Sequence, residues 1–164
     1  MIRRDSSGVS LLELCALLMI LGILVALTLQ GAGLLQQALD AGKAKGAADI
    51  VVQAIRYARQ RAITDAQDYC VAFSIAGGGV GQYQLYTGAR SGTSCTGPTV
   101  GGPVDLPGRA TIGGAVALRF TPVSTVDPTG PTPIVVTSSS GGAPCSVTVT
   151  VTPEGGAQIP GTYC

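Results

Sequence analysis

A single carboxylate, Glu13, lies near the start of an otherwise apolar segment, residues 9–29. A charged side chain costs about 2.5–3.5 kcal/mol at the centre of a bilayer, so an acid kept in such a segment needs a partner. A short polar stretch, residues 1–8, precedes the segment and carries Arg3 and Arg4. Glu13 is therefore the first candidate for a functional residue, and we expect it to pair with a cation.

The rest of the composition gives little support to catalysis. The chain has no histidine, which removes the usual general base and the commonest metal ligand. None of its cysteines has the Cys-x-x-Cys spacing of zinc or thioredoxin-like sites. Asp65 and Asp68 lie three residues apart, but two carboxylates without further ligands are typical of a solvated helix end. We therefore expect no enzymatic activity, no metal and no cofactor.

Five cysteines are present. Cys15 lies in the apolar segment, where a cysteine behaves as a small apolar residue. The other four predict two disulfides in an exported domain, with three connectivities open. We favour Cys70–Cys95 and Cys145–Cys164, because each bond closes a short segment that contains a predicted turn.

The apolar segment reaches the length of about 20 residues that a helix needs to cross a bilayer. Arg3 and Arg4 place its beginning in the cytoplasm, so the remaining chain is expected outside. An ordinary signal sequence with a cut near Gly33, or a plain membrane anchor, has the same basic start. Glu13 argues against both, since ordinary signal cores carry no glutamate at their start, and the helical pattern continues past Gly33.

The sequence from Gly8 to Glu13, GVSLLE, resembles the prepilin motif GFTLIE of type IV pilins and type II secretion pseudopilins. The resemblance implies that a prepilin peptidase cuts after Gly8 and that the new amine of Val9 is methylated. It also implies that Glu13 pairs with the amine of a neighbouring subunit when a filament assembles on an inner-membrane platform. Three positions depart from the family pattern: Val9, Ser10 and Gln30, where many members have a helix-bending proline.

Helical periodicity continues beyond the apolar segment. One face is expected to be buried and is rich in alanine: Ala44, Ala48, Val51, Ile55, Ala58 and Ala62. The opposite face is polar: Asp49, Gln53, Arg56 and Gln60. Because the side chains of this stripe are small, the element that packs on it must lie close to the helix backbone.

After Asp68 the apolar period changes to two, which predicts strands. Strands are expected at residues 69–76, 82–87, 110–112, 115–120, 134–138 and 145–152, with a returning segment at residues 157–160. Hairpins are expected across residues 77–81 and at Gly113-Gly114. Residues 91–108 and 123–133 are rich in glycine, proline or threonine and are expected to be loops.

These elements predict an α+β pilin fold, in which a long N-terminal helix, with a membrane-spanning first half, packs on a small antiparallel sheet domain. The expected boundaries are a leader at residues 1–8, a membrane and assembly segment at residues 9–30, the outer half of the helix at residues 31–66, and an extracytoplasmic β domain at residues 67–164.

The order of elements also resembles the minor H-type pseudopilins (GspH/FimT). The resemblance rests on the helix end at residues 54–63, the strand at residues 69–73 and the stretch at residues 118–122. A tryptophan-containing strand usual in the family is missing, because the chain has no tryptophan.

Together the resemblances imply a minor subunit of a type IV pilus or a type II secretion pseudopilus. It would be a single-pass inner-membrane protein with a periplasmic or extracellular domain. Its expected partners are other pilin or pseudopilin subunits, the prepilin peptidase, the inner-membrane assembly platform and membrane lipid.

Two alternatives remain open. One is a DNA-binding subunit for DNA uptake, with Arg90 and Arg109 as candidate contacts. Without residues 1–8 the chain has eight basic and eight acidic residues, so it exerts no long-range attraction on nucleic acid. The other alternative is a secreted or anchored β domain behind an ordinary signal sequence. The mass of the membrane form separates a filament subunit, whether structural or DNA-binding, from a secreted or anchored domain. Only a filament subunit requires a cut between Gly8 and Val9.

Overall fold

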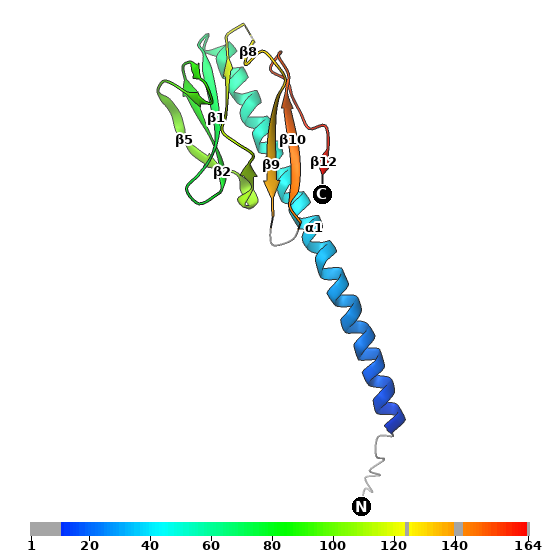
Figure 1. Cartoon of the computed structure of the whole chain (residues 1–164). Helices are drawn as coiled ribbons and strands as arrows, with labels where there is room; N and C mark the ends of the chain where they lie inside the picture. The colour runs from blue at the N-terminus through cyan, green and yellow to red at the C-terminus, as the bar shows by residue number, and fades with distance from the viewer. Residues whose placement is uncertain (1–10, 124, 140–142, 164) are drawn as a thin grey trace, which may run out of the picture. The chain divides into compact units, whose positions relative to one another are not determined.

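The computed structural model describes residues 11–123, 125–139 and 143–163, with the backbone alone at residues 27–32, 34, 162 and 163. Helix α1, Leu11–Thr64, confirms the long helix expected from the sequence (Figure 1). The chain divides into two compact units, Met1–Gln36 and Gln37–Cys164, and each is described by itself. Among the described residues, none of the helices combines the length and the apolar character that crossing a membrane requires.

The second unit contains two antiparallel sheets and a small hairpin. In the first sheet the strand order is β5-β2-β1-β7-β8; its strands are β1 Tyr69–Ile75, β2 Gly81–Thr87, β5 Thr99–Asp105, β7 Val116–Phe120 and β8 Val126–Asp127. In the second sheet the order is β11-β10-β9-β6, and β12 also pairs with β10; its strands are β6 Thr111–Ile112, β9 Thr132–Ser138, β10 Cys145–Val151, β11 Ala157–Gln158 and β12 Thr162–Tyr163. The hairpin consists of β3 Arg90–Ser91 and β4 Ser94–Cys95, and a short 3-10 helix, η1 Pro107–Arg109, follows β5.

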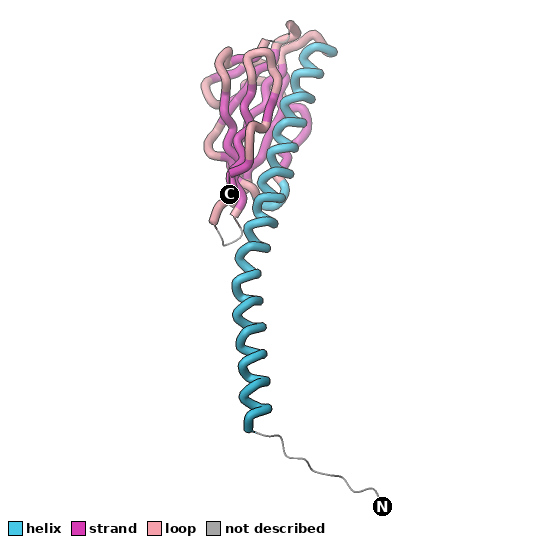
Figure 2. Tube along the Cα trace, turned by 90° about the vertical axis from the view of Figure 1, so that its right-hand side faces the viewer, coloured by secondary structure: helices cyan, strands magenta, loops and turns pink. Residues whose placement is uncertain are grey.

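The part of α1 in this unit packs against both sheets through its alanine-rich stripe. Every residue of the expected stripe is fully buried: Ala44, Ala48, Val51, Ile55, Ala58 and Ala62. They share one hydrophobic core with Phe73 of β1, Phe120 of β7 and Val149 of β10. In Figure 2 the strands lie along one side of this part of the helix. Small side chains let the helix backbone approach the sheets, and the larger residues of the strands fill the core.

One of the two expected hairpins, across residues 77–81, is present. Strands β1 and β2 pair in full register from Tyr69 opposite Thr87 to Ile75 opposite Gly81, and a backbone bond from Ala76 N–H to the Val80 carbonyl closes the turn at 2.8 Å. Strands β9 and β10 were expected as strands, and they pair with each other from Thr132 opposite Val151 to Ser138 opposite Cys145. Along β10 buried valines alternate with half-buried threonines, as the period of two predicts.

The expected loop at residues 91–108 was wrong. The chain there forms β3, β4 and the edge strand β5. Strand β5 shows no alternation because it is almost entirely exposed and because the register with β2 shifts between Tyr83 and Leu85. Glycine and proline at residues 101–103 accompany this irregularity, and such residues are typical of edge strands and bulges.

The expected hairpin at Gly113-Gly114 was also wrong. Strand β6 pairs with β9, whereas β7 pairs with β1, so the chain changes sheets at these glycines. The N–H of Gly113 donates to the Val135 carbonyl at 2.9 Å, which binds this segment to the second sheet. A Gly-Gly pair predicts a change of direction, but it does not specify which strand the chain pairs with next.

The alanine stripe gives a direct test of the packing. Ala58 is fully buried, so Ala58→Leu forces extra methylenes into a filled core and should lower the free energy of unfolding by about 1–3 kcal/mol. The matched change Gln60→Leu, on the exposed face, should stay within about 0.5 kcal/mol. Thermal unfolding of the detergent-solubilised chain measures both; equal effects would contradict the proposed packing.

Candidate functional site

The first candidate site is the apolar segment of α1, defined here as residues 11–26. All its residues are exposed, including many large ones, from Leu11, 81% exposed, to Val25, 52% exposed. Monomeric soluble proteins rarely expose apolar surface on this scale, and where it occurs it marks contact with protein or membrane. This first unit therefore carries a surface that needs a partner.

Glu13 is the one charged residue of that segment and lies in the first turn of α1. The unpaired N–H groups and the dipole of a helix favour an anion at this position. Its side chain is exposed, and within the described residues it forms no ion pair. The carboxylate is thus available to a cation from another molecule. Gly8 and Val9, the expected cleavage and methylation positions, lie outside the described residues.

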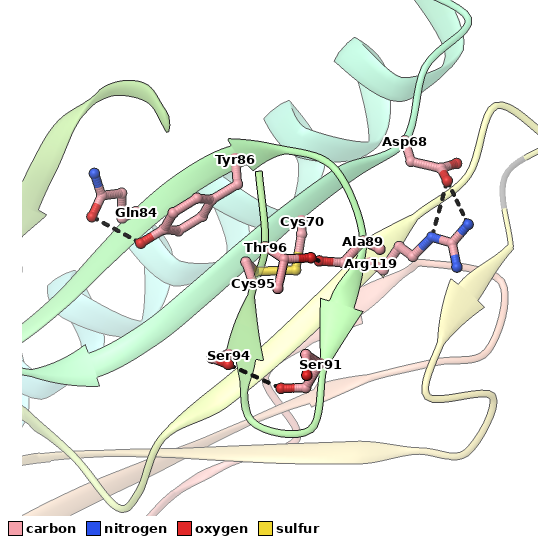
Figure 3. The surroundings of a disulfide bond; sticks show 10 residues. All are labelled: Asp68, Cys70, Gln84, Tyr86, Ala89, Ser91, Ser94, Cys95, Thr96 and Arg119. Carbon is pink, nitrogen blue, oxygen red and sulfur yellow. Dashed lines mark hydrogen bonds and ion pairs between the residues drawn. A yellow bond between two sulfur atoms is a disulfide. The ribbon is translucent and has the colours of Figure 1, made fainter. Parts of the chain in front are cut away.

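The second candidate feature is the disulfide between Cys70 and Cys95, which the structure contains as expected. Its Cα atoms are 5.7 Å apart, and it ties the buried strand β1 to β4 of the small hairpin (Figure 3). At the base of this hairpin two segments of the chain lie very close together. A Cβ on Gly88 would be 2.1 Å from the Thr96 carbonyl oxygen, and a Cβ on Gly97 would be 2.1 Å from the Thr87 carbonyl oxygen. Both glycines also have positive φ, so no other residue fits there.

The expected partner of Cys145 lies outside the described residues, because Cys164 is one of them. Cys145 itself is fully buried at the start of β10, and its Sγ lies 3.8 Å from the Gln37 carbonyl oxygen. The pairing Cys145–Cys164 remains a prediction.

Two ion pairs that the sequence did not reveal flank the disulfide. Arg119, which faces Cys70 in the β1–β7 register, donates from Nε to Asp68 at 3.1 Å and also from its terminal nitrogen (Figure 3). Arg90 donates to Asp127 at 3.1 Å. These pairs join residues 51 and 37 positions apart, and only the strand pairing brings them together.

The carboxylates weighed as metal ligands are both bonded within the chain. Asp68 is held by Arg119, while Asp65 accepts bonds from Tyr69 Oη at 2.6 Å and from Arg61 at 3.3 Å. Over the described residues no group of three or more metal-ligating side chains comes together.

The two arginines considered for nucleic acid differ in their surroundings. Arg90 lies in β3, is half-buried and is bound to Asp127. Arg109 ends η1 and is exposed. Of these two arginines only Arg109 is exposed and outside the ion pairs of the described residues. A single arginine gives little of the clustered positive charge that binds nucleic acid.

Comparison with known proteins decides the family. The sequence model of one family, described as "Type II transport protein GspH", matches residues 47–155, which is more than half of the chain. The chain belongs to the GspH family. The expected likeness to the H-type pseudopilins is thereby confirmed. No curated protein matches the chain.

Solved structures show that this GspH protein has the pilin fold. Two crystal structures of the type IV minor pilin FimU from Pseudomonas aeruginosa superpose on it with TM-scores of 0.50 and 0.53. The identities are 17% and 16%, and the matches cover 71% and 73% of this chain and 92% and 90% of those chains. The expected α+β architecture, a helix packed on a small antiparallel sheet domain, is therefore confirmed.

Hydrogen bonds connect the end of α1 to the start of β1. Arg61 donates from Nε to Tyr57 Oη at 3.0 Å and from its terminal nitrogen to Asp65, and Tyr69 donates to the same carboxylate. The hydrogen bond to Asp65, followed by burial and by the negative charge of Asp65, raises the pKa of Tyr69 above its ordinary value. The neutral phenol is thus the form that stabilises this junction.

The raised pKa of Tyr69 predicts a loss of stability in alkali. Its contribution is fully present below the unfolded pKa of about 10 and is lost as pH rises through the higher folded pKa. Asp65→Asn should lower the pKa of Tyr69, whereas the control Asp105→Asn should not. Titration of tyrosinate absorbance, with Tyr69→Phe to identify the component, measures this. An unchanged Tyr69 titration in Asp65→Asn would contradict the assignment.

The disulfide gives a further prediction for the GspH domain. Cys70 and Cys95 are 25 residues apart, and closing a loop of this size stabilises a fold by roughly 3 kcal/mol. The double change Cys70→Ser with Cys95→Ser should lower the unfolding free energy of the domain by that amount. Cys15→Ser, at the exposed free cysteine of the apolar segment, is the control and should leave the domain's unfolding unchanged. Similar curves for all three proteins would show that the bond is not structural.

Proposed function

We propose that this GspH-family protein is a minor pilin or pseudopilin, a structural, non-catalytic subunit of a type IV pilus or a type II secretion pseudopilus. One observation carries the proposal: a domain of this family and fold follows an exposed apolar helical segment whose only charge is Glu13 in the first turn. An isolated domain has no use for such a segment, whereas a filament buries it in a core of packed helices.

Processing and location follow from the same assignment. The leader, residues 1–8, stays in the cytoplasm, residues 9–30 anchor the chain in the inner membrane, and the domain lies outside, where the disulfide between Cys70 and Cys95 forms. Prepilin peptidase cuts after Gly8, and the new amine of Val9 is methylated. An inner-membrane assembly platform then passes the subunit from membrane lipid to the other subunits of the filament.

The physical basis of assembly is the compensation of two charges. The amine of Val9 is a cation at a helix N-terminus, where the dipole disfavours it, and Glu13 is an anion in apolar surroundings. Leaving either charge unpaired in a buried site costs about 3–5 kcal/mol. When Glu13 of an incoming subunit meets the amine of its neighbour, both penalties are relieved, and the apolar side chains of the two helices are buried together.

The proposal predicts that Glu13→Gln lowers the incorporation of the subunit into filaments by more than about tenfold, because the neighbouring amine is left without its anion. Glu154→Gln, the same chemical change in an exposed turn of the domain, is the matched control and should incorporate normally. Sheared filaments are quantified by immunoblotting against the membrane pool. Normal incorporation of Glu13→Gln would overturn the proposed role of Glu13.

Intact mass of the membrane form tests the processing step separately. Loss of residues 1–8 together with the gain of one methyl group is expected, and Gly8→Val should abolish both changes. A cut near Gly33, or no cut, would instead support a secreted or simply anchored domain.

A further inference from the structure

Two arginines of α1 differ from most others of the second unit, because no acid of the chain neutralises them. Three arginines of this unit form ion pairs with its acids: Arg61, Arg90 and Arg119. Arg56 and Arg59 take part in none of the ion pairs of the described residues. They are three residues apart on one helix, so their side chains are neighbours, and like charges at this spacing repel each other.

Both arginines line the same recess beside α1. It has a volume of 270 Å³, and we call it the arginine recess; its lining residues are Arg56, Arg59, Gln60, Ile63 and Thr64. Arg56 is exposed, and it also lines a neighbouring groove that runs between α1 and residues 157–159. The recess thus combines two unneutralised positive charges with the apolar side chain of Ile63, which is 49% exposed.

The side chain of Arg59 is restrained by packing, while its hydrogen bonding is incomplete. The turn at residues 153–155 passes against it: a Cβ on Gly155 would lie 3.2 Å from Cδ and 3.4 Å from Nε of Arg59. The Nε atom is buried without a hydrogen-bond partner, which is unfavourable for a donor. The terminal nitrogens of Arg59 are not among the buried unpaired atoms, so an acceptor from another molecule can reach them.

The recess suits a single carboxylate better than a chain of phosphates. A guanidinium binds a carboxylate through two parallel hydrogen bonds, and Ile63 offers a surface for the methylene groups of an acidic side chain. Asp49 lines the neighbouring groove, and Glu154 precedes Gly155; both acids are exposed. Their negative charges disfavour a nucleic acid, which binds through several phosphates at once.

We propose that the arginine recess binds an aspartate or glutamate side chain of a neighbouring filament subunit of a different kind. The proposal rests on the proposed function, because a minor subunit is surrounded mainly by subunits other than itself. The bound carboxylate would neutralise the two adjacent guanidinium groups and accept their hydrogen bonds. Charged contacts of this type select the correct partner more than they add affinity, so the recess would determine which subunit this one adjoins.

Carbodiimide coupling tests the contact directly, because the reagent joins an amine to a carboxylate that touches it. Arg56→Lys places an amine in the recess and retains the positive charge. Sheared filaments of this variant are treated with a water-soluble carbodiimide, and the linked peptides are mapped by mass spectrometry. We expect an amide between residue 56 and an aspartate or glutamate of another pilin subunit. Arg109→Lys, the same change at an exposed arginine outside the recess, gives the background yield.

Charge reversal tests whether the contact matters for assembly. Arg56→Glu should lower incorporation of the subunit into filaments by about tenfold, because it places two carboxylates together. The matched control Arg109→Glu should incorporate normally, and unfolding curves show whether each domain is intact. Changing the mapped acid of the partner to lysine should restore most of the incorporation of Arg56→Glu. Failure of this second change to restore incorporation would contradict direct pairing.

Binding of a short DNA duplex to the detergent-solubilised chain is measured in parallel. Retention of DNA that Arg56→Glu abolishes, together with no amide at residue 56, would assign the recess to phosphate and overturn the proposal. An amide to Asp49 or Glu154 of the same chain, or to another copy of it, would overturn the proposal as well.

The outcomes separate this proposal from the function on which it rests. Filaments that require Glu13 but give no amide at residue 56 above the background of Arg109→Lys overturn the role of the recess alone. If the chain is not cut after Gly8 and enters no filament, both proposals fail.

Discussion

A carboxylate in an apolar helical surface has to be compensated, and the first unit of this chain offers only part of what Glu13 requires. The first turn of α1 supplies unpaired N–H groups and a favourable dipole, but these partial charges do not replace a cation in surroundings without water. The side chains around Glu13 are large, apolar and exposed. An apolar surface that buried them would also exclude water from Glu13. A second helix with a free amine at its start meets both needs at once.

Helix α1 uses two kinds of apolar surface for two kinds of neighbour. In the apolar segment the residues are mostly leucine and isoleucine, which keep their contact area available to other molecules. In the second unit the buried stripe is mostly alanine, because there the chain supplies its own cover from two sheets, and phenylalanine and valine of the strands fill the space. A stripe of leucines in the second unit would keep the sheets at a distance, and a stripe of alanines in the first would bury little area on assembly.

Local sequence patterns predicted where helices and strands lie better than they predicted which strands pair and which charged side chains meet. The stripe from Ala44 to Ala62 and the β1–β2 hairpin were predicted because their signals lie within one element or one turn. Strand β5 was missed because an exposed edge strand with a bulge needs no alternation, and Gly113-Gly114 turned out to connect two sheets. The ion pairs of Arg119 and Arg90 join residues distant in sequence, so only the register of β1, β7 and β8 reveals them.

At the candidate site, the residue type and position of Glu13 were enough to predict a functional carboxylate. The disulfide between Cys70 and Cys95 was predicted from the short loop that it closes.

Some charged side chains stabilise the domain through ion pairs, and others are exposed outside these pairs, where another molecule can reach them. The pairs of Arg61, Arg119 and Arg90 lie at the junction of α1 with β1 and around the disulfide, where each cation meets an acid of the same chain. Asp49 and Arg56, both exposed on α1, take part in none of the ion pairs of the described residues. Residues 9–164 carry eight basic and eight acidic residues and so have little long-range field, which means that partners must be selected at contact distance.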